Sequence, residues 1–150
     1  MKFGKFHKKL EGMDSYVVFN STTTHLTVFK ELWQVLVDEF VSHGFTCSKS
    51  ECFKKGECVG YTGAFDDIEI TIEDHSFVMP FHSFANSADG ENCRLMVKPQ
   101  DKSKNYMELG NSFMITFPPT FDFEQNQIQF RVNPNAPPDT MINVINIKSN

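Results

Sequence analysis

The stretch that decides the fold reads Tyr16-Val17-Val18-Phe19-Asn20-Ser21-Thr22-Thr23-Thr24-His25-Leu26. Its first half is apolar and rich in residues that favour β-strands, and its second half is a cluster of small hydroxyl side chains. The first half predicts a strand over residues 15–20, and the second half predicts a turn. Because an apolar-periodic segment follows, the expected local order is strand, turn and helix.

The helix is expected over residues 29–43. Leu32, Leu36 and Phe40 recur at helical spacing and form one apolar stripe. Gly44 stands where a glycine commonly ends a helix. This helix would therefore bury one face against a sheet.

Most other segments of the chain predict strands. Ile68, Ile70 and Ile72 alternate with polar residues, which is typical of a half-buried strand. Residues 45–64 are expected to form a loop because they are rich in cysteine and glycine. Further strands are expected over residues 77–79, 93–98, 106–110, 113–117, 120–123 and 127–132. The fold class is therefore mainly β, with one principal α-helix packed on the sheet.

Length and charge exclude several classes of protein. The chain has 150 residues, which is enough for one domain with a core of its own. Fourteen basic against 19 acidic residues give a net charge of −5, which argues against a nucleic-acid-binding surface. No apolar run approaches the roughly 18 residues of a membrane span. Sixteen phenylalanines favour a β-rich core or a large contact surface.

The two ends differ in character from residues 15–133. Residues 1–14 are basic and lack the apolar core of a secretory signal, so a solvated arm is expected. In residues 134–150, three prolines precede an apolar segment. We expect this tail to extend away from its own domain and to dock on a partner, and a disordered end is the alternative. The expected partner-binding side chains are Met141, Ile142, Val144, Ile145 and Ile147.

Four segments together resemble the pepsin-like aspartic protease family. The turn at Asn20 resembles the catalytic Asp-Thr/Ser-Gly-Thr/Ser turn, and residues 65–80 resemble a hairpin of that family. Tyr106-Met107-Glu108-Leu109-Gly110-Asn111-Ser112-Phe113 is similar to the Trp-x-Leu-Gly-Asp-x-Phe strand, and residues 121–130 are similar to the final hairpin. The match covers residues 15–133 and implies a partial pepsin-like lobe, the second half of the C-terminal one. It also implies that the turn at Asn20 meets Leu109 and Gly110 where two strands of the sheet cross.

The resemblance implies a degenerate catalytic site at Asn20, Ser21, Thr22 and Thr23. Enzymes of the family use two aspartates, one from each lobe, and one of them takes a proton from the attacking water. An amide at position 20 cannot accept that proton, and Thr22 replaces the glycine of the motif. No second motif is present, so we expect no enzyme activity. Without the resemblance, the same residues are an ordinary turn, and Asn20-Ser21-Thr22 is also a glycosylation sequon.

Four cysteines leave three classes of arrangement open. The resemblance implies a disulfide between Cys58 and Cys93, which leaves Cys47 and Cys52 close enough to pair. The alternatives are a zinc site that includes His43, whose spacing lacks the usual close cysteine pair, and free thiols in a reducing compartment. We expect no metal and no cofactor, and we interpret His25 as a turn residue.

The expected function is that of a catalytically inactive pepsin-like fragment, a structural or protein-binding subunit of a larger assembly. Partner protein chains would supply or cover the missing half of the lobe. The alternatives are an aspartic endopeptidase fragment completed by another chain and a secreted pseudo-protease that acts as a binding module or inhibitor. An intracellular or organellar assembly of secretory ancestry is expected, without nucleic acid and without a membrane span. Because Pro118-Pro119 cannot donate to a ladder, an edge or a break is expected there.

Overall fold

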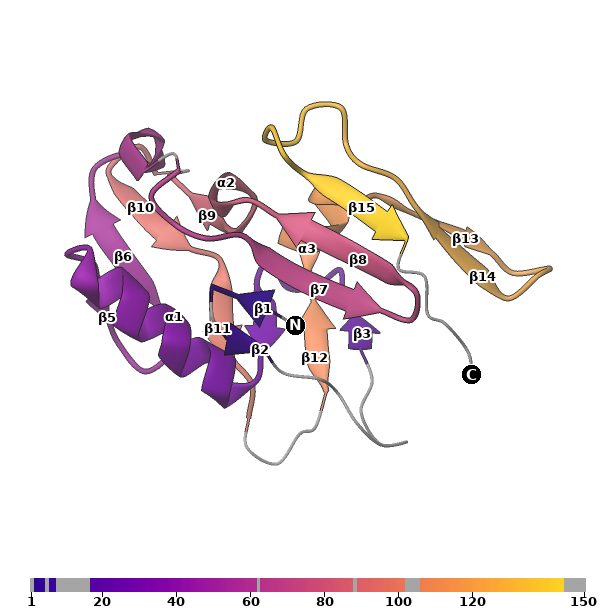
Figure 1. The fold of residues 1–150 in the computed structure, drawn as a ribbon, viewed down its shortest axis with the longest axis horizontal. Helices are drawn as coiled ribbons and strands as arrows, with labels where there is room; N and C mark the ends of the chain where they lie inside the picture. Colours follow the sequence, from indigo (N-terminus) through magenta and orange to yellow (C-terminus); the bar gives the residue numbers. More distant parts are fainter. Residues whose placement is uncertain are drawn as a thin grey trace.

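The protein is a small mixed α/β domain made mostly of strands, with three short helices (Figure 1). Its computed structural model describes residues 2–4, 6–7, 17–61, 63–87, 89–101 and 106–144. None of the helices in these residues has the length and apolar character that crossing a bilayer requires.

The strands on either side of the turn at Asn20 belong to one four-stranded sheet. It contains β3 (Val17–Phe19), β4 (Leu26–Val28), β11 (Val97–Pro99) and β12 (Met107–Leu109), in the order β11-β4-β12-β3. β12 runs parallel to β3 and antiparallel to β4. The strands β3 and β4 are consecutive in the chain, yet β12 lies between them. Residues 20–25 therefore pass over the end of β12.

A second sheet collects both ends of the described chain. It contains β1 (Lys2–Phe3), β2 (Phe6–His7), β7 (Ile68–Ile72), β8 (His75–Met79) and β15 (Met141–Val144), in the order β15-β8-β7-β1-β2. The expected hairpin of β7 and β8 is present, with Ile68 opposite Met79.

The expectations for both ends of the chain are wrong where the structure describes them. Phe3 pairs with Ile68 and is buried, so this part of residues 1–14 is not a solvated arm. Ile142 pairs with Phe77 of β8, so the tail does not extend away from its own domain. Strands that pair over such long distances in the sequence cannot be predicted from the local sequence pattern of either strand.

Part of a third sheet lies in residues 45–64, where a loop was expected. It contains β5 (Thr46–Cys47), β6 (Cys52–Lys55), β9 (Ala85–Asn86) and β10 (Asn92–Leu95), in the order β5-β6-β10-β9. A 3-10 helix, η1 (Cys58–Tyr61), follows β6. The loop interpretation was wrong for β5, β6 and η1. Each is only two to four residues long, which is too short to show a periodic pattern in the sequence.

The principal helix α1 (Lys30–Ser42) forms one residue inside each predicted boundary. Leu32, Leu36 and Phe40 are completely buried. The Phe40 ring stacks on Phe65 at a centroid distance of 4.3 Å and meets Phe45 edge-on at 4.9 Å. The predicted apolar stripe is therefore the face that α1 turns to the core.

Two further helices are short and were not predicted. The first is α2 (Phe81–Phe84) and the second is α3 (Asn111–Thr116). The strand expected over residues 113–117 is wrong, because Phe113 and Phe117 lie one helical turn apart and Phe117 N–H donates to the Phe113 carbonyl at 2.8 Å. A short apolar run fits a strand and a buried helix equally well.

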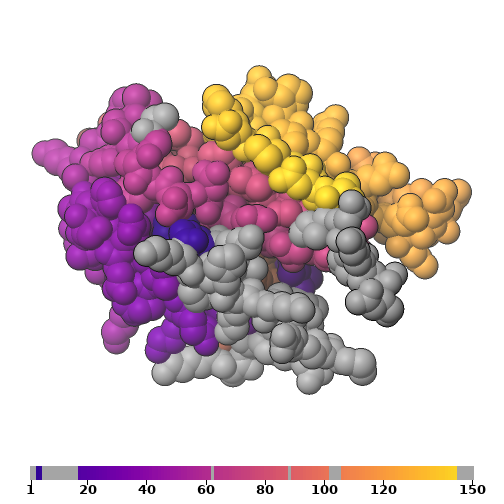
Figure 2. Space-filling view, viewed as in Figure 1, coloured from indigo at the N-terminus to yellow at the C-terminus, as the bar shows by residue number. Residues whose placement is uncertain are grey.

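The hairpin of β13 (Pro119–Asp122) and β14 (Gln127–Phe130) is a separate two-stranded sheet. It projects from the body at the right of Figures 1 and 2. Pro118 separates α3 from β13, and Pro119 begins the strand, so a break is present at the predicted position. Phe130 holds the base of the hairpin to the core, 5.5 Å from Phe19 and 5.1 Å from Phe77 between ring centroids.

Candidate functional site

The turn at Asn20 lies against the end of β12. Asn20 N–H donates to the Leu109 carbonyl at 3.0 Å. The side-chain oxygen of Asn20 accepts two hydrogen bonds from Thr22, one from the backbone N–H at 3.0 Å and one from the hydroxyl at 2.6 Å. The expected meeting of this turn with the Leu109-Gly110 segment is thus present in the structure.

Gly110 permits the close approach of the two segments. It is buried, and a Cβ atom at this position would lie 2.5 Å from the carbonyl oxygens of both Thr23 and His25. Real Cβ atoms do not approach backbone oxygens so closely, so only glycine fits here without a shift of the backbone.

The N-terminus of α3 continues the contact beyond Gly110. Asn111 N–H donates to the Thr23 carbonyl at 2.8 Å, and Ser112 N–H donates to the Thr24 carbonyl at 3.0 Å. The Asn111 side chain donates to the Ser21 carbonyl at 3.0 Å. Every one of these bonds uses backbone carbonyls of the turn, so the geometry does not depend on a carboxylate at position 20.

The chemistry of the turn is that of neutral polar groups. Asn20 and Thr23 are half-buried, whereas Ser21 and Thr22 are exposed. Burial lowers the pKa of His25, and the Lys98 charge lowers it further, against a smaller opposing effect of Glu51. Asn20 carries an amide, which does not act as a proton acceptor in the way that a carboxylate does.

A cavity of about 310 Å³ opens beside the crossing. Thr24 and Ser112 connect it to the turn, and its wall includes residues of α2, β9, α3 and the segment 133–137. The hydroxyl oxygens of Ser83 and Ser112 are buried without a hydrogen-bond partner. Because these two oxygens are closed off from solvent, they cannot contact a molecule that enters the cavity.

The four cysteines form two disulfides. Cys58 of η1 joins Cys93 of β10, and Cys47 of β5 joins Cys52 of β6. The pairing is the one that the resemblance implies. It leaves no thiolate for the zinc alternative, and in the described part of the chain no group of three or more His, Cys, Asp or Glu side chains is arranged to hold a metal ion.

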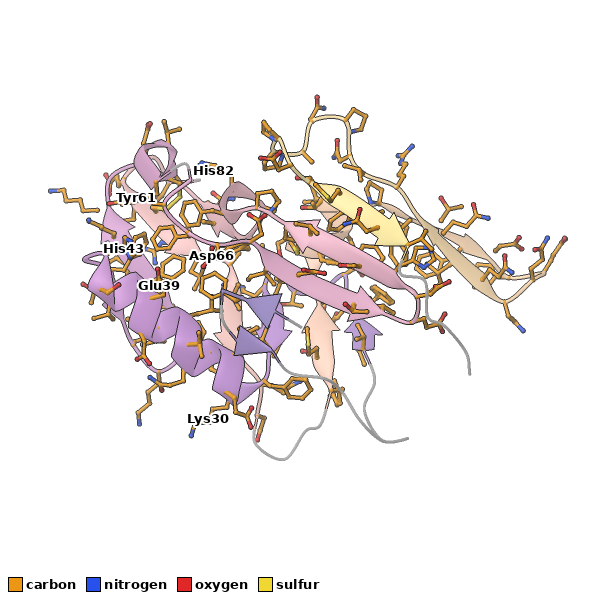
Figure 3. All side chains as sticks on the ribbon, in the orientation of Figure 1. Lys30, Glu39, His43, Tyr61, Asp66 and His82 are labelled. Atoms are coloured by element: carbon orange, nitrogen blue, oxygen red, sulfur yellow. A yellow bond between two sulfur atoms is a disulfide. The ribbon has the colours of Figure 1, made fainter. Side chains whose placement is uncertain are left out.

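His43, the fourth ligand of that alternative, lies at the end of α1 (Figure 3). Its ring is 4.7 Å from the Phe65 ring, and Nδ1 is 2.9 Å from the Glu39 carbonyl oxygen. The histidine therefore packs at the end of its own helix.

The predicted partner-binding residues divide into three groups. Met141 and Val144 are exposed on β15, with 40% and 68% of their surface accessible. Ile142 packs against the core from the same strand. Ile145 and Ile147 lie outside the described residues.

The most exposed aromatic side chains were missed by sequence reasoning. Phe121 and Phe123 are 50% and 86% accessible, and their rings stack with centroids 6.3 Å apart. Ile128, directly opposite Phe121 in the hairpin, is 42% accessible. The spacing of two residues places both phenylalanines on one face, but that pattern predicts a buried face as readily as an exposed one.

Comparison of the chain with protein-family models and with curated proteins found no match to either. The residues and the topology described above are therefore the basis for any assignment of function.

Proposed function

We propose that the chain is a catalytically inactive, pepsin-like partial lobe that serves as a protein-binding subunit. The observation that carries the proposal is the hydrogen bonding of the Asn20 side chain. Its side chain stands where the resemblance places the catalytic aspartate, and its oxygen already accepts two bonds from Thr22. An amide held in this way completes the turn and has no proton-accepting role.

The strand order supports the pepsin-like assignment. The resemblance implies a sheet crossing at which the turn at Asn20 meets Leu109 and Gly110, and in the sheet β12 lies between β3 and β4. Gly110 at the crossing point, and the contact of Asn20 with Leu109, fit the positions that the resemblance assigns.

Exposed apolar side chains support a binding role. Scattered apolar residues are normal on a protein surface, but Phe121, Phe123 and Ile128 lie together on one projecting hairpin. A partner that covers them would gain aromatic contacts of the kind that dominate protein–protein interfaces.

A second candidate, a secreted binding module or inhibitor, is favoured by the two disulfides. Disulfides persist in oxidising compartments, and both cysteine pairs are joined. This candidate differs from the first in compartment and shares its mode of action, which is binding without catalysis.

The test is recovery of the chain from the cells that produce it, after mild cross-linking, followed by native mass spectrometry. The proposal predicts a stoichiometric complex with at least one other protein. Recovery of the chain as a free monomer, under conditions that preserve known complexes of the same extract, would contradict it.

A further inference from the structure

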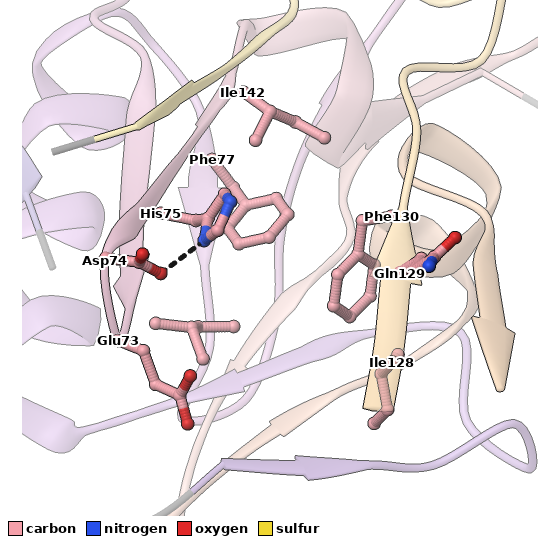
Figure 4. A pocket seen from close by; sticks show the side chains of 9 residues that line it. Glu73, Asp74, His75, Phe77, Ile128, Gln129, Phe130 and Ile142 are labelled. Atoms are coloured by element: carbon pink, nitrogen blue, oxygen red, sulfur yellow. Dashed lines mark ion pairs between the residues drawn. The ribbon is translucent and has the colours of Figure 1, made fainter. Parts of the chain in front are cut away.

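A groove of about 430 Å³ separates the β13–β14 hairpin from the sheet that contains β7, β8 and β15 (Figure 4). On the hairpin side, Ile128 and Phe130 turn towards the sheet, while Gln129 turns away from it. On the sheet side, Phe77 and Ile142 form the apolar wall. The remaining lining residues are Ile72, Glu73, Asp74, His75 and Gln129.

The apolar wall of the hairpin continues beyond the groove. Phe121 pairs with Ile128 across the hairpin, so both side chains lie on the face that Ile128 turns to the groove. Phe123 stacks on Phe121 from two residues further on. An apolar track therefore leads from Phe130, at the closed base, to Phe123 at the tip.

The groove lies between one face of the sheet of β7, β8 and β15 and one face of the β13–β14 hairpin, and an outermost strand lies on each side of it. β15 is the last strand of its sheet, and β14 has only β13 beside it among the described residues. Outermost strands present unpaired backbone groups to which an extended segment can add. The free edges of β15 and β14 beside the groove offer backbone hydrogen-bond partners that an extended segment can use and a helix cannot.

The charge at the open end of the groove is negative. Glu73 and Asp74 form the turn between β7 and β8 and line the groove, and Glu124 lies in the turn at the hairpin tip. Among the described residues that line the groove there is no Lys or Arg, and the one basic group among them, His75, pairs with Asp74 at 2.6 Å. Negative charge at this mouth favours a partner that brings positive charge to it.

The same charges make a second copy of the chain an unfavourable occupant of the groove. Two copies joined through this surface would bring two acidic surfaces together, and each copy carries a net charge of −5. Like charges at an interface cost affinity, so self-association through the groove is disfavoured.

We propose that the groove binds an extended segment of a partner protein, with alternating apolar side chains along the hairpin face and Lys or Arg at the end that meets the acidic tips. This inference rests on the proposed function and adds to it the surface and the chemistry of the partner.

The test begins with a displayed library of random peptides of about nine residues, the length of an ordinary strand, selected against the full chain. Enriched peptides should alternate apolar residues and carry Lys or Arg near one end. Their binding should weaken when the salt concentration rises from about 0.05 M to about 0.5 M, because the charge contribution is screened.

Variants locate the binding site of a selected peptide. The double substitution Phe121→Ser and Ile128→Ser should weaken binding by about tenfold or more, because it removes the exposed anchors. The double charge reversal Glu73→Lys and Glu124→Lys should weaken binding by about fivefold at low salt. The matched controls are Val41→Ser on α1 and Glu91→Lys, both exposed and remote in sequence, which should leave binding unchanged.

Several results would overturn the inference. These are no enrichment, enrichment of acidic peptides, or equal binding by the groove variants and the controls, with folding of every variant verified by circular dichroism. A concentration-dependent dimer that Phe123→Ser abolishes would show a second copy as the occupant and would also overturn it. If the complex from native cells survives Phe121→Ser with Ile128→Ser, this inference fails while the proposed function stands. If no complex is found in native cells, the proposed function itself fails.

Discussion

The crossing of β12 between β3 and β4 and the β13–β14 hairpin are built from opposite kinds of interaction. At the crossing, backbone groups bond to backbone groups, and Gly110 fits against the Thr23 and His25 carbonyls without space for a side chain. On the hairpin, large side chains such as Phe121 and Phe123 stand in solvent. The contacts at the crossing are made inside the molecule, whereas the hairpin leaves apolar side chains exposed to solvent.

The comparison therefore distinguishes residues that stabilise the fold from exposed residues that we propose bind a partner protein. The turn at the crossing is held to β12 and α3 mainly by main-chain bonds, and the Asn20 side chain bonds within the turn to Thr22. The hairpin contributes little to the core beyond Phe130, so its outer side chains are available for binding. Each of the following predictions changes one side of this comparison.

The largest effect is expected at the disulfides of the body. Replacing Cys58 and Cys93 by alanine opens a loop of 35 residues and should lower the free energy of unfolding by about 4 kcal/mol. The same change at Cys47 and Cys52 opens a loop of five residues and should cost about 2 kcal/mol. Urea denaturation of both variants measures the difference. An equal loss in the two would contradict the loop-length account.

A single methyl group at the crossing should have the next largest effect. Gly110→Ala places a Cβ atom 2.5 Å from two carbonyl oxygens and should cost about 3 kcal/mol. Gly60→Ala is the matched control, because a Cβ atom there meets nothing within 4 Å. Thermal unfolding compares them. Similar melting temperatures for the two variants would mean that the crossing is not tightly packed.

Substitution on the hairpin should leave the fold nearly unchanged. Phe123 is 86% exposed, so Phe123→Ser should alter the free energy of unfolding by less than about 0.5 kcal/mol. Phe113, which is fully buried, provides the contrast: Phe113→Ala should lower the free energy of unfolding far more than Phe123→Ser does. Denaturation curves decide the point, and a large loss from Phe123→Ser would place that ring in the folded core.

The smallest effect concerns acid stability of the turn before β10. Backbone N–H groups of Asn92 and Glu91 donate to Asp89 and lower its pKa from 3.8 to about 2. A lowered pKa in the folded state stabilises the protein above pH 3.8, and this contribution is lost as the pH falls towards 2. The stability difference between the wild type and Asp89→Ala should therefore shrink over that range. A difference that is constant with pH would contradict the assignment.

Local pattern predicted the elements whose signals are local. The stripe of Leu32, Leu36 and Phe40 indicated α1, and the alternation of Ile68, Ile70 and Ile72 indicated β7. The contact of the hydroxyl-rich turn with Leu109-Gly110 was implied by the resemblance, because neither segment alone predicts the other as its neighbour.

Long-range pairing could not be predicted in the same way. Phe3 is buried only because β1 adds to β7, and β15 pairs with β8 across more than 60 residues of chain. The run Phe113–Phe117 is too short to show a period, so α3 was predicted as a strand. Exposure of Phe121 and Phe123 follows from where the hairpin projects, which is a property of the whole fold.

The central proposal, that the crossing has a structural role and no catalytic one, is tested most directly by an acid cleavage assay. The purified chain is incubated with an unfolded protein substrate at about pH 4, where an aspartate pair works, with and without pepstatin. We predict no pepstatin-sensitive cleavage by the chain, and none by Asn20→Asp, because the second carboxylate is still missing. Pepstatin-sensitive turnover by the unaltered chain, at a rate that follows its concentration, would contradict the claim.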